Sequence, residues 1–263
     1  LHYYVVSNTA RKSMFTHLSQ RQAHLIEKMD AANADSEQLE QTYADFYTLN
    51  RWVSQWNRVY AKYIRPHAIE IQKQGKIFQV LDVGCGGGDI AFFLFKWLKK
   101  DGISAHITGI DIDNRAIDWA KANRSVQPET ALVNKNKPTG LFFECISTTE
   151  LVHRGHKVDL VMNNHVLHHI PSTEINPFLT ECAELGTKVI CNDLERSSLA
   201  YTLFSLCLFP LRFRSSFIYQ DGRTSLKKSF RKNELDSLSS EGWKVERLFP
   251  FRLLLIFEGE RGR

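Results

Sequence analysis

The sequence feature that most constrains this chain is a short apolar strand that breaks into glycines and is followed at once by a helix. The strand is expected at residues 77–83, and Gly84, Gly86 and Gly88 come directly after it. Apolar side chains then recur at three- and four-residue spacing over residues 90–98, which predicts a helix. This order lets the backbone approach a ligand at a helix N-terminus, although a tight turn also needs glycine. The glycines alone leave both interpretations open.

Strand and helix patterns alternate along the rest of the chain. Helices are expected at residues 90–98, 115–123, 172–185 and 232–241, and further strands at residues 105–110, 141–146, 158–163, 188–191, 243–248 and 253–258. This alternation is typical of a parallel sheet with right-handed crossovers, and two successive final strands close such a sheet as an antiparallel hairpin. We therefore predict an α/β fold with a Rossmann-like, seven-stranded and mostly parallel sheet.

Two segments lie outside this alternation. Residues 1–72 are predicted to form an N-terminal helical extension or cap, whose long helical pattern is interrupted at Pro66. Residues 73–263 are predicted to form the sheet domain, with an apolar, aromatic-rich lid insert at about residues 197–230. Within the lid, residues 221–222 (Asp-Gly) are expected to turn the chain.

Charge and cysteine content narrow the class of protein. The net charge of +5 comes from 34 Lys and Arg against 29 Asp and Glu and is spread along the chain, so no nucleic-acid partner is expected. The five cysteines are far apart and odd in number, which is typical of reduced thiols in the cytosol. Residues 1–6 show no targeting pattern, and the longest apolar run, residues 199–211, is too short to span a bilayer. We expect a cytoplasmic protein.

An acid in front of the glycine loop and another after the next strand define the expected ligand. The order is Asp82-x-Gly84-x-Gly86-x-Gly88, without the lysine of a P-loop and without the third glycine that nicotinamide-binding loops carry inside the helix. The Asp82 carboxylate repels a pyrophosphate but can hold a cationic amino group. Asp111, 23 residues beyond the last glycine, can accept both hydroxyls of a ribose. A ligand with an ammonium group and a ribose, such as S-adenosylmethionine, fits this pattern.

Three segments resemble a known family. Residues 80–88 and 109–113 resemble the class I S-adenosylmethionine-dependent methyltransferases. Residues 159–170 (DLVMNNHVLHHI) resemble the fourth motif of the small-molecule branch that includes the ubiquinone and menaquinone methyltransferases. The resemblance covers about residues 75–195, and its three motifs follow the family's order at the ends of expected strands. It implies an S-adenosylmethionine-dependent methyltransferase.

The resemblance also implies which residues hold the cofactor. These are Asp82, Gly84, Cys85, Gly86, Gly88, Asp111, Ile112, Ser147, Asn164 and His165. Asp82 is expected at the amino group, Asp111 at the ribose hydroxyls and Ile112 against the adenine, with the glycines along the methionine and ribose. Asn164 and His165 are expected to border the sulfonium and the donor methyl. Ser147 stands where the family often has an acid for the adenine amino group, so a hydroxyl or a backbone carbonyl would have to accept that bond.

Two residues are candidates for a general base. His165 is expected near the donor methyl. Asp193 follows the strand at 188–191 and is expected to face the same opening of the site as His165. One alternative is that methyl transfer mainly needs alignment and proximity and uses no base. The other is that Asp193 caps a helix or a turn. The histidines at 165, 168 and 169 lack the further ligands of a zinc site. No partner acid completes a magnesium site with residues 192–193, so we expect metal-free chemistry.

Aromatic residues mark the expected acceptor pocket. The residues predicted to line it are Tyr43, Tyr47, Trp52, Trp56 and Phe204. Packing against the sheet also explains the first four, which follow one helical stripe. Within the lid, the apolar segment at residues 199–210 is followed by Arg212 and Arg214, a pattern typical either of burial or of peripheral contact with a membrane.

These observations predict an enzyme that moves a methyl group from S-adenosylmethionine to an oxygen or carbon of a small apolar, aromatic acceptor such as a phenol, a quinone or a polyketide-like compound. One alternative is methylation of a protein or RNA, for which the sequence shows neither a concentrated basic surface nor a suitable motif at residues 163–166. Others are a nicotinamide-dependent oxidoreductase and a silent binding protein that keeps the fold. The sequence decides neither the acceptor nor the oligomeric state.

Overall fold

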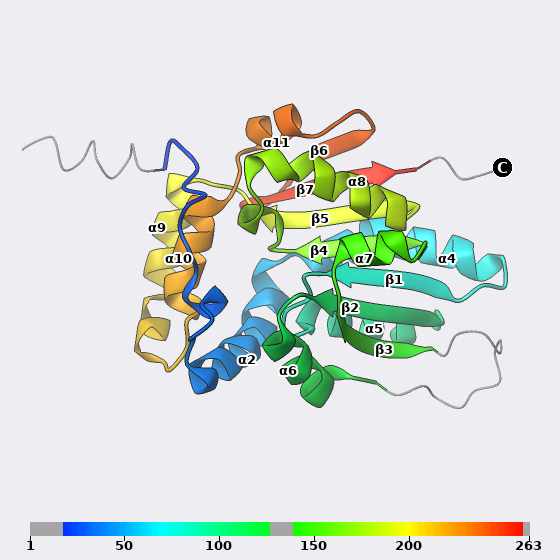
Figure 1. The fold of residues 1–263 in the computed structure, drawn as a ribbon, viewed down its shortest axis with the longest axis horizontal. Coiled ribbons are helices and arrows are strands. Elements are labelled where there is room, and N and C mark those ends of the chain that lie inside the picture. The colour runs from blue at the N-terminus through cyan, green and yellow to red at the C-terminus, as the bar shows by residue number, and fades with distance from the viewer. Residues whose placement is uncertain (1–17, 127–138, 260–263) are drawn as a thin grey trace, which may run out of the picture.

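A seven-stranded sheet runs through the centre of the computed structural model, which describes residues 18–126 and 139–259 (Figure 1). The strand order is β3-β2-β1-β4-β5-β7-β6. The strands are β1 (Phe78–Val83), β2 (Ala105–Asp111), β3 (Gly140–Cys145), β4 (Leu160–Asn164), β5 (Lys188–Leu194), β6 (Trp243–Leu248) and β7 (Arg252–Glu258). Residues 1–6, where the sequence shows no targeting pattern, lie outside the described residues.

The strand pairing confirms the predicted Rossmann-like fold. β1 pairs in parallel with β2 on one side and with β4 on the other, so that Asp82 lies in register with Gly109 and Met162. β4 and β5 are also parallel, whereas β7 runs antiparallel between β5 and β6. The carboxyl ends of β1, β2, β4 and β5 therefore share one edge. The strand order reverses between β1 and β4, where open α/β sheets form ligand-binding crevices.

Helices cover both faces of the sheet because its strands alternate between two apolar cores. One face is covered by α4 (Arg65–Lys73), α5 (Asp89–Lys100) and α6 (Asn114–Arg124), and the other by α7 (Thr148–His153), α8 (Ile175–Leu185) and α11 (Lys232–Leu238). Phe78 and Val80 of β1 face the first core, and Leu81 and Val83 face the second. Burying each such side chain contributes about 1.5–3 kcal/mol, so β1 is held from both sides.

A layer of helices lies across the carboxyl ends of the strands, at the left of Figure 1. This cap consists of η1 (Lys28–Asp30), α2 (Ser36–Val53), α9 (Ser198–Cys207), η5 (Phe209–Phe213) and α10 (Ile218–Lys228). Residues 18–27, which we call the strap, run along α10, and the Gln22 backbone N–H donates to the Lys227 carbonyl at 3.1 Å. The cap thus combines segments from both ends of the chain.

The helical pattern of the N-terminal region breaks earlier than predicted. α2 ends at Val53, and Gln55 adopts a left-handed backbone with a φ of 58°. The chain then continues without a break through α3 (Trp56–Val59), a π-helical turn, η2 (Tyr60–Ile64), and α4. The predicted interruption at Pro66 is not a break in the chain's helical path, because the π-helical turn η2 leads directly into α4, of which Pro66 is the second residue.

The predicted turn at Asp221 and Gly222 is also wrong, because both residues lie inside α10. Asp221 accepts the backbone N–H groups of Lys28 and Met29 at 2.8 and 3.0 Å, which fixes η1 on the helix. Gly222 leaves room for the ring of Phe204, which lies where a side chain at position 222 would stand. Here the two residues serve packing between cap helices rather than a change of chain direction.

Candidate active site

The glycine loop follows β1 as predicted, and its three alternate glycines serve different purposes. Gly84, Gly86 and Gly88 all have left-handed backbones, with φ of 65°, 52° and 72°. A Cβ on Gly84 would lie 2.5 Å from the Val166 side chain, and one on Gly88 would lie 2.5 Å from the Phe143 ring. A Cβ on Gly86 would meet nothing within 4 Å. The loop is therefore packed tightly at both ends and open in the middle.

Asp111 holds the open middle of this loop. Its Oδ2 accepts the Gly86 backbone N–H at 2.9 Å, and its Oδ1 accepts the Asp113 backbone N–H at 3.0 Å. Burial raises the pKa of Asp111, although these backbone donors oppose the rise. A carboxylate offers about four lone pairs, so two remain for further donors. The predicted ribose-binding acid thus lies at the end of β2 and also shapes the loop.

A cluster of buried acids lies beneath the loop. Asp82 is 1% exposed, and its Oδ2 has no hydrogen-bond partner among the described residues. Burial raises the pKa of Asp82 well above its usual range, and the nearby Asp89 and Asp111 raise it further. Such an unpaired acceptor in a negative environment suits an ammonium group, which brings both charge and N–H donors. These buried carboxyl oxygens therefore fit the amino group of S-adenosylmethionine.

Two members of this cluster were not predicted from the sequence. Asp89, the first residue of α5, is buried and accepts from Asn50 Nδ2 at 3.0 Å. Asn50 comes from the cap helix α2, and its Oδ1 is a second buried acceptor without a partner among the described residues. The acid directly after the last glycine was a usable signal for Asp89. Asn50 gave none, because only the fold brings α2 to the loop.

The predicted adenine side of the site is more open. Ile112 is 81% exposed, directly beyond Asp111. Ser147 caps α7, where its Oγ accepts the Glu150 backbone N–H at 3.2 Å.

Cys85 is buried in the glycine loop, and burial raises the pKa of its thiol well above the usual range. A thiol that stays protonated is a packing group rather than a nucleophile.

After β4, the side chains of Asn164 and His165 are both held by Arg252. Asn164 Oδ1 accepts from Arg252 Nη2 at 2.8 Å and from Trp56 Nε1 at 3.0 Å. His165 has a left-handed φ of 62°, and its Nε2 contacts Arg252 Nη1. Burial lowers the pKa of His165 well below its usual range, and the Arg252 charge lowers it further. His165 is therefore neutral near pH 7.

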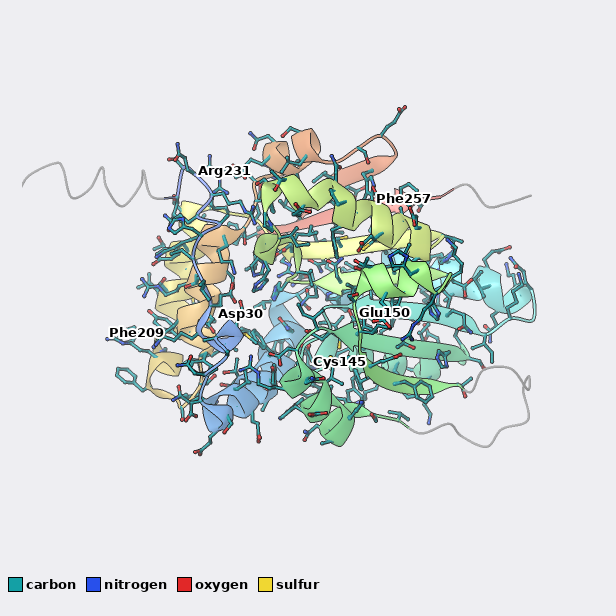
Figure 2. All side chains as sticks on the ribbon, in the orientation of Figure 1. Asp30, Cys145, Glu150, Phe209, Arg231 and Phe257 are labelled. Carbon is teal, nitrogen blue, oxygen red and sulfur yellow. The ribbon has the colours of Figure 1, made fainter. Side chains whose placement is uncertain are left out.

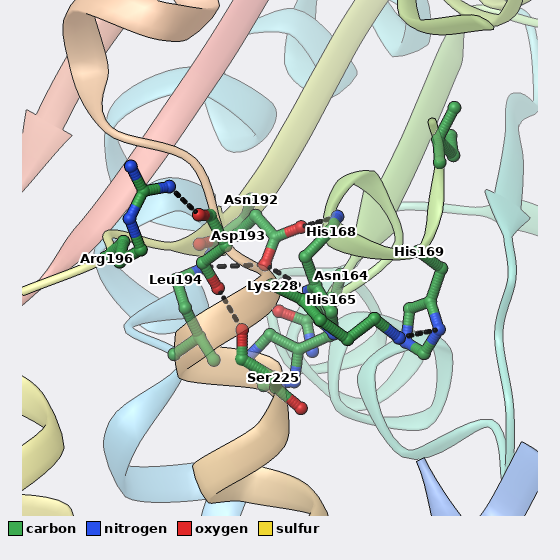
Figure 3. A network of polar contacts seen from close by, with 12 residues as sticks. Asn164, His165, His168, His169, Asn192, Asp193, Leu194, Arg196, Ser225 and Lys228 are labelled. Atoms are coloured by element: carbon green, nitrogen blue, oxygen red, sulfur yellow. Dashed lines mark hydrogen bonds and ion pairs between the residues drawn. The ribbon is translucent and has the colours of Figure 1, made fainter. Parts of the chain in front are cut away.

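Asp193 lies inside β5, which extends to Leu194, and binds His168 rather than facing an open space (Figure 3). Its Oδ1 lies 2.8 Å from His168 Nδ1, and the other ring nitrogen lies 3.3 Å from Glu27 of the strap. Burial alone would lower the pKa of His168, but the two carboxylates raise it to about 9. His168 is therefore a buried imidazolium between two acids.

Glu27 also pairs with a lysine of the cap. Lys228 Nζ lies 3.3 Å from Glu27 Oε1. It also lies 3.1 Å from His169 Nδ1, a contact that is drawn in Figure 3. The ligand atoms of Glu27, His168 and His169 lie within 4.8 Å of one another, as a metal site requires. The lysine ammonium already supplies the cation that such a cluster attracts. The arrangement is an ion-pair network that joins the strap and α10 to the loop after β4.

The predicted pocket aromatics are divided among several places. Tyr43 packs on Trp119, Tyr47 on Phe93, Trp56 beneath Asn164 and Phe204 on α10, whereas Trp52 is 71% exposed. Most of them serve contacts between the cap and the sheet domain, the alternative that the sequence left open. Their role at an acceptor stays a prediction.

The fold and site together define a Rossmann-like protein with a glycine loop and acids suited to a cationic nucleoside ligand. Residues 80–188 match a family model described as a methyltransferase domain. The chain is 32% identical over 148 residues to the ubiquinone biosynthesis O-methyltransferase of Coxiella burnetii, a match that covers 55% of this chain and 53% of that protein. The protein of the same name from Shewanella pealeana is 30% identical over 138 residues, which cover 49% of this chain and 50% of the relative.

The chain thus spans about half the length of the curated relatives that it matches. Among solved structures, the plantazolicin methyltransferase BpumL in complex with SAH has a TM-score of 0.56 and 11% sequence identity, over 96% of this chain and 100% of that one. At this identity the likeness shows the fold alone. Over residues 80–188 this chain is similar to methyltransferase domains, and among the class I S-adenosylmethionine-dependent methyltransferases it resembles the ubiquinone methyltransferases.

Proposed function

We propose that this protein transfers a methyl group from S-adenosylmethionine to an oxygen or carbon of a small apolar, aromatic acceptor. The observation that carries the proposal is the unpaired, buried carboxyl oxygen of Asp82 beside the glycine loop that Asp111 holds. In the transfer, the bond between the methyl carbon and sulfur breaks as the bond to the acceptor forms. The sulfonium becomes a neutral thioether, and the acceptor proton is lost to water.

The geometry of the site supports the following cofactor roles. Asp82 receives the ammonium group with help from Asn50, and Asp111 uses its remaining lone pairs for the ribose hydroxyls. The backbone of residues 84–88 lies along the ligand, and the backbone near Ser147 serves the adenine amino group, since the Ser147 hydroxyl already caps α7. Asn164 and His165 border the donor methyl. Methyl transfer then depends chiefly on alignment and proximity.

The acceptor class rests on the cap and on the relatives. The two relatives described above are named as O-methyltransferases of ubiquinone biosynthesis, and such a reaction places a phenolic oxygen beside an apolar ring system. Here the cap lies over the carboxyl ends of the strands, and its helix α9 is rich in apolar side chains. We infer that the division is functional, with residues 1–72 and the lid at 197–230 forming the acceptor side and the sheet domain the donor side.

Calorimetric titration with S-adenosylmethionine is the direct test of the donor. We expect binding to the wild-type protein and none of NADH at the same concentration. Incubation with a methyl-labelled donor and a panel of catechol, resorcinol and naphthohydroquinone then tests the acceptor class through labelled, extractable product. A protein that fails to bind S-adenosylmethionine at millimolar concentration contradicts the proposal, as does label that appears only in added RNA or protein.

We also propose that the outer side of the cap contacts a membrane surface from which an apolar acceptor is taken. α9 and η5 expose five large apolar side chains, namely Leu199, Leu203, Leu206, Phe209 and Phe213. Phe209 points outward, away from the sheet (Figure 2). Arg212 and Arg214, both exposed on either side of Phe213, add positive charge that suits anionic lipid. None of the described helices is long and apolar enough to cross a membrane.

Flotation with lipid vesicles tests this contact. Vesicles that contain phosphatidylglycerol should carry the protein, and the bound fraction should fall with salt and with the double substitution Leu206→Ser and Phe213→Ser. Phe249→Ser is the matched control, since Phe249 is equally exposed but lies outside the cap. Equal flotation of both variants, or no flotation of the wild type, contradicts the membrane contact.

A further inference from the structure

Arg252, the first residue of β7, reaches the end of β4, the residue that follows it and the neighbouring strand β5, which border the donor side of the site. Its side chain is buried, with 1% of the residue exposed. Nε donates to Asn192 Oδ1 at 2.8 Å, and Nη2 donates to Asn164 Oδ1 at 2.8 Å and to the Asn192 carbonyl at 3.3 Å. Nη1 contacts His165 Nε2. One guanidinium therefore joins the end of β4 to β5.

We propose that Arg252 is a positioning residue for the methyl transfer inferred above, on which this inference rests. Its guanidinium holds Asn164 and His165 in one arrangement and makes the His165 ring a hydrogen-bond donor through Nδ1 rather than a proton acceptor. The residue lies far from the motifs in sequence, and the antiparallel register brings it to them, since Arg252 pairs with Leu194.

The state of the His165 ring follows from what a guanidinium can do. Arginine has only donors, so His165 Nε2 must accept, and its lone pair is then no longer free for another proton. A neutral imidazole carries one proton, which must sit on Nδ1. In this arrangement His165 cannot serve as the general base. It can donate to an electron-rich acceptor oxygen and so orient that oxygen toward the donor methyl.

The backbone at His165 shows that this arrangement is imposed by its surroundings. A left-handed φ is uncommon for a residue with a side chain. The His165 N–H donates to the Asn192 carbonyl at 3.0 Å, and Arg252 holds the ring. Both restraints converge on Asn192, whose own Nδ2 donates to the Ser54 carbonyl at 2.8 Å after the cap helix α2. The hydrogen bonds that restrain His165 thus extend from Arg252 on β7, through Asn192, to the cap.

The charged groups around His165 come from several elements. Arg252 on β7 and the imidazolium of His168 oppose protonation of the ring, while Asp193 on β5 and Glu27 on the strap favour it. Burial and Arg252 prevail, so the ring stays neutral. Removal of the Arg252 charge should therefore return the ring toward ordinary titration.

Nitrogen-15 NMR of the histidine rings tests the proposal without any acceptor. In the wild-type protein, the spectrum should contain one ring with a protonated Nδ1 and a bare Nε2 that does not change from pH 8 to pH 5. The signal is assigned through its loss in His165→Gln. In Arg252→Met the restraint on the His165 ring is lost, so the spectrum should show the other tautomer or a titration near the ordinary pKa. Arg252→Lys should give an effect between those of the wild type and Arg252→Met. Arg247→Met, an exposed arginine on β6 that pairs with Glu195, should change nothing.

Binding of SAH, measured by calorimetry on the same proteins, separates this inference from the function itself. Arg252→Met should weaken SAH about tenfold, since Asn164 loses a charged donor, while Arg247→Met binds normally. A wild-type His165 ring with its proton on Nε2, or one that titrates normally, overturns the inference even if Arg252→Met fails to fold. Failure of the wild type to bind SAH overturns the proposed function instead.

Discussion

Asp193 accepts two hydrogen bonds from a single residue, His168, through the backbone N–H at 2.9 Å and through ring Nδ1 at 2.8 Å. The pair ties the loop after β4 to the interior of β5. The opposite ring nitrogen faces Glu27, so the same histidine also attaches the strap. Because all three side chains are buried, their charges depend strongly on one another.

The first prediction is that stability falls with pH as His168 loses its proton. Its pKa is about 9 in the folded protein against an ordinary value of 6.5. A raised pKa means that the stabilisation is fully present below pH 6.5 and is lost as the pH rises through 9. The free energy of unfolding should therefore fall by about 3 kcal/mol over this interval, measured by urea denaturation.

The control for this prediction is the substitution His168→Gln. Without the imidazolium, the unfolding free energy should be lower at pH 6.5 and nearly constant between pH 6.5 and 9. His153→Gln, at the exposed end of α7, should keep the wild-type dependence. A slope that survives in His168→Gln would assign the pH dependence to other groups.

The second prediction is that Asp82→Asn stabilises the free protein but weakens donor binding. The pKa of Asp82 is raised in the folded state, so its charge opposes folding near pH 7, and the neutral amide should raise the free energy of unfolding. SAH should bind about 10- to 100-fold more weakly, because its ammonium loses a carboxylate. 5′-Methylthioadenosine lacks that ammonium and should bind both proteins equally. Equal weakening of both ligands would place Asp82 elsewhere on the cofactor.

The third prediction compares Gly86 and Gly88, which both have a left-handed backbone conformation. Gly86→Ala should cost about 1 kcal/mol of stability, since only the left-handed backbone opposes it. Gly88→Ala should cost about 3 kcal/mol or more, because its Cβ also meets the Phe143 ring. In a double-mutant cycle, Gly88→Ala combined with Phe143→Ala should cost less than the sum of the single changes. Additive costs would show that the Phe143 contact is unimportant.

The order of strands and the glycine loop could be predicted because their signals are local. The apolar runs, the glycines and the acids at 82 and 111 each lie within a few residues of the structure that they specify. The long helical pattern after Ser36 was less informative, because a helical stripe continues across Gln55, where one left-handed residue redirects the chain.

The partners of the site residues could not be predicted in the same way. Arg252 meets Asn164 across 88 residues and Asn50 meets Asp89 across 39, and only the assembled sheet and cap create these pairs. Asp193 was expected to face the opening beyond its strand, but it lies inside β5 with its carboxylate buried against His168. Its partner His168 turns it from a candidate base into a counter-ion, which no spacing in the sequence indicates.

The fourth prediction is that Asp111→Asn disturbs both the loop and the ribose site. Asp111 accepts two backbone N–H groups, and an asparagine can accept only one of them, because its NH₂ would face the other donor. The Kd for SAH should rise about 10- to 100-fold in calorimetry. The wild type should also prefer adenosine over 2′-deoxyadenosine, and the variant should lose that preference. Asp118→Asn on the exposed side of α6 is the matched control and should retain both properties. A variant that keeps the preference for the ribose hydroxyl would show that Asp111 shapes the loop without contacting the cofactor.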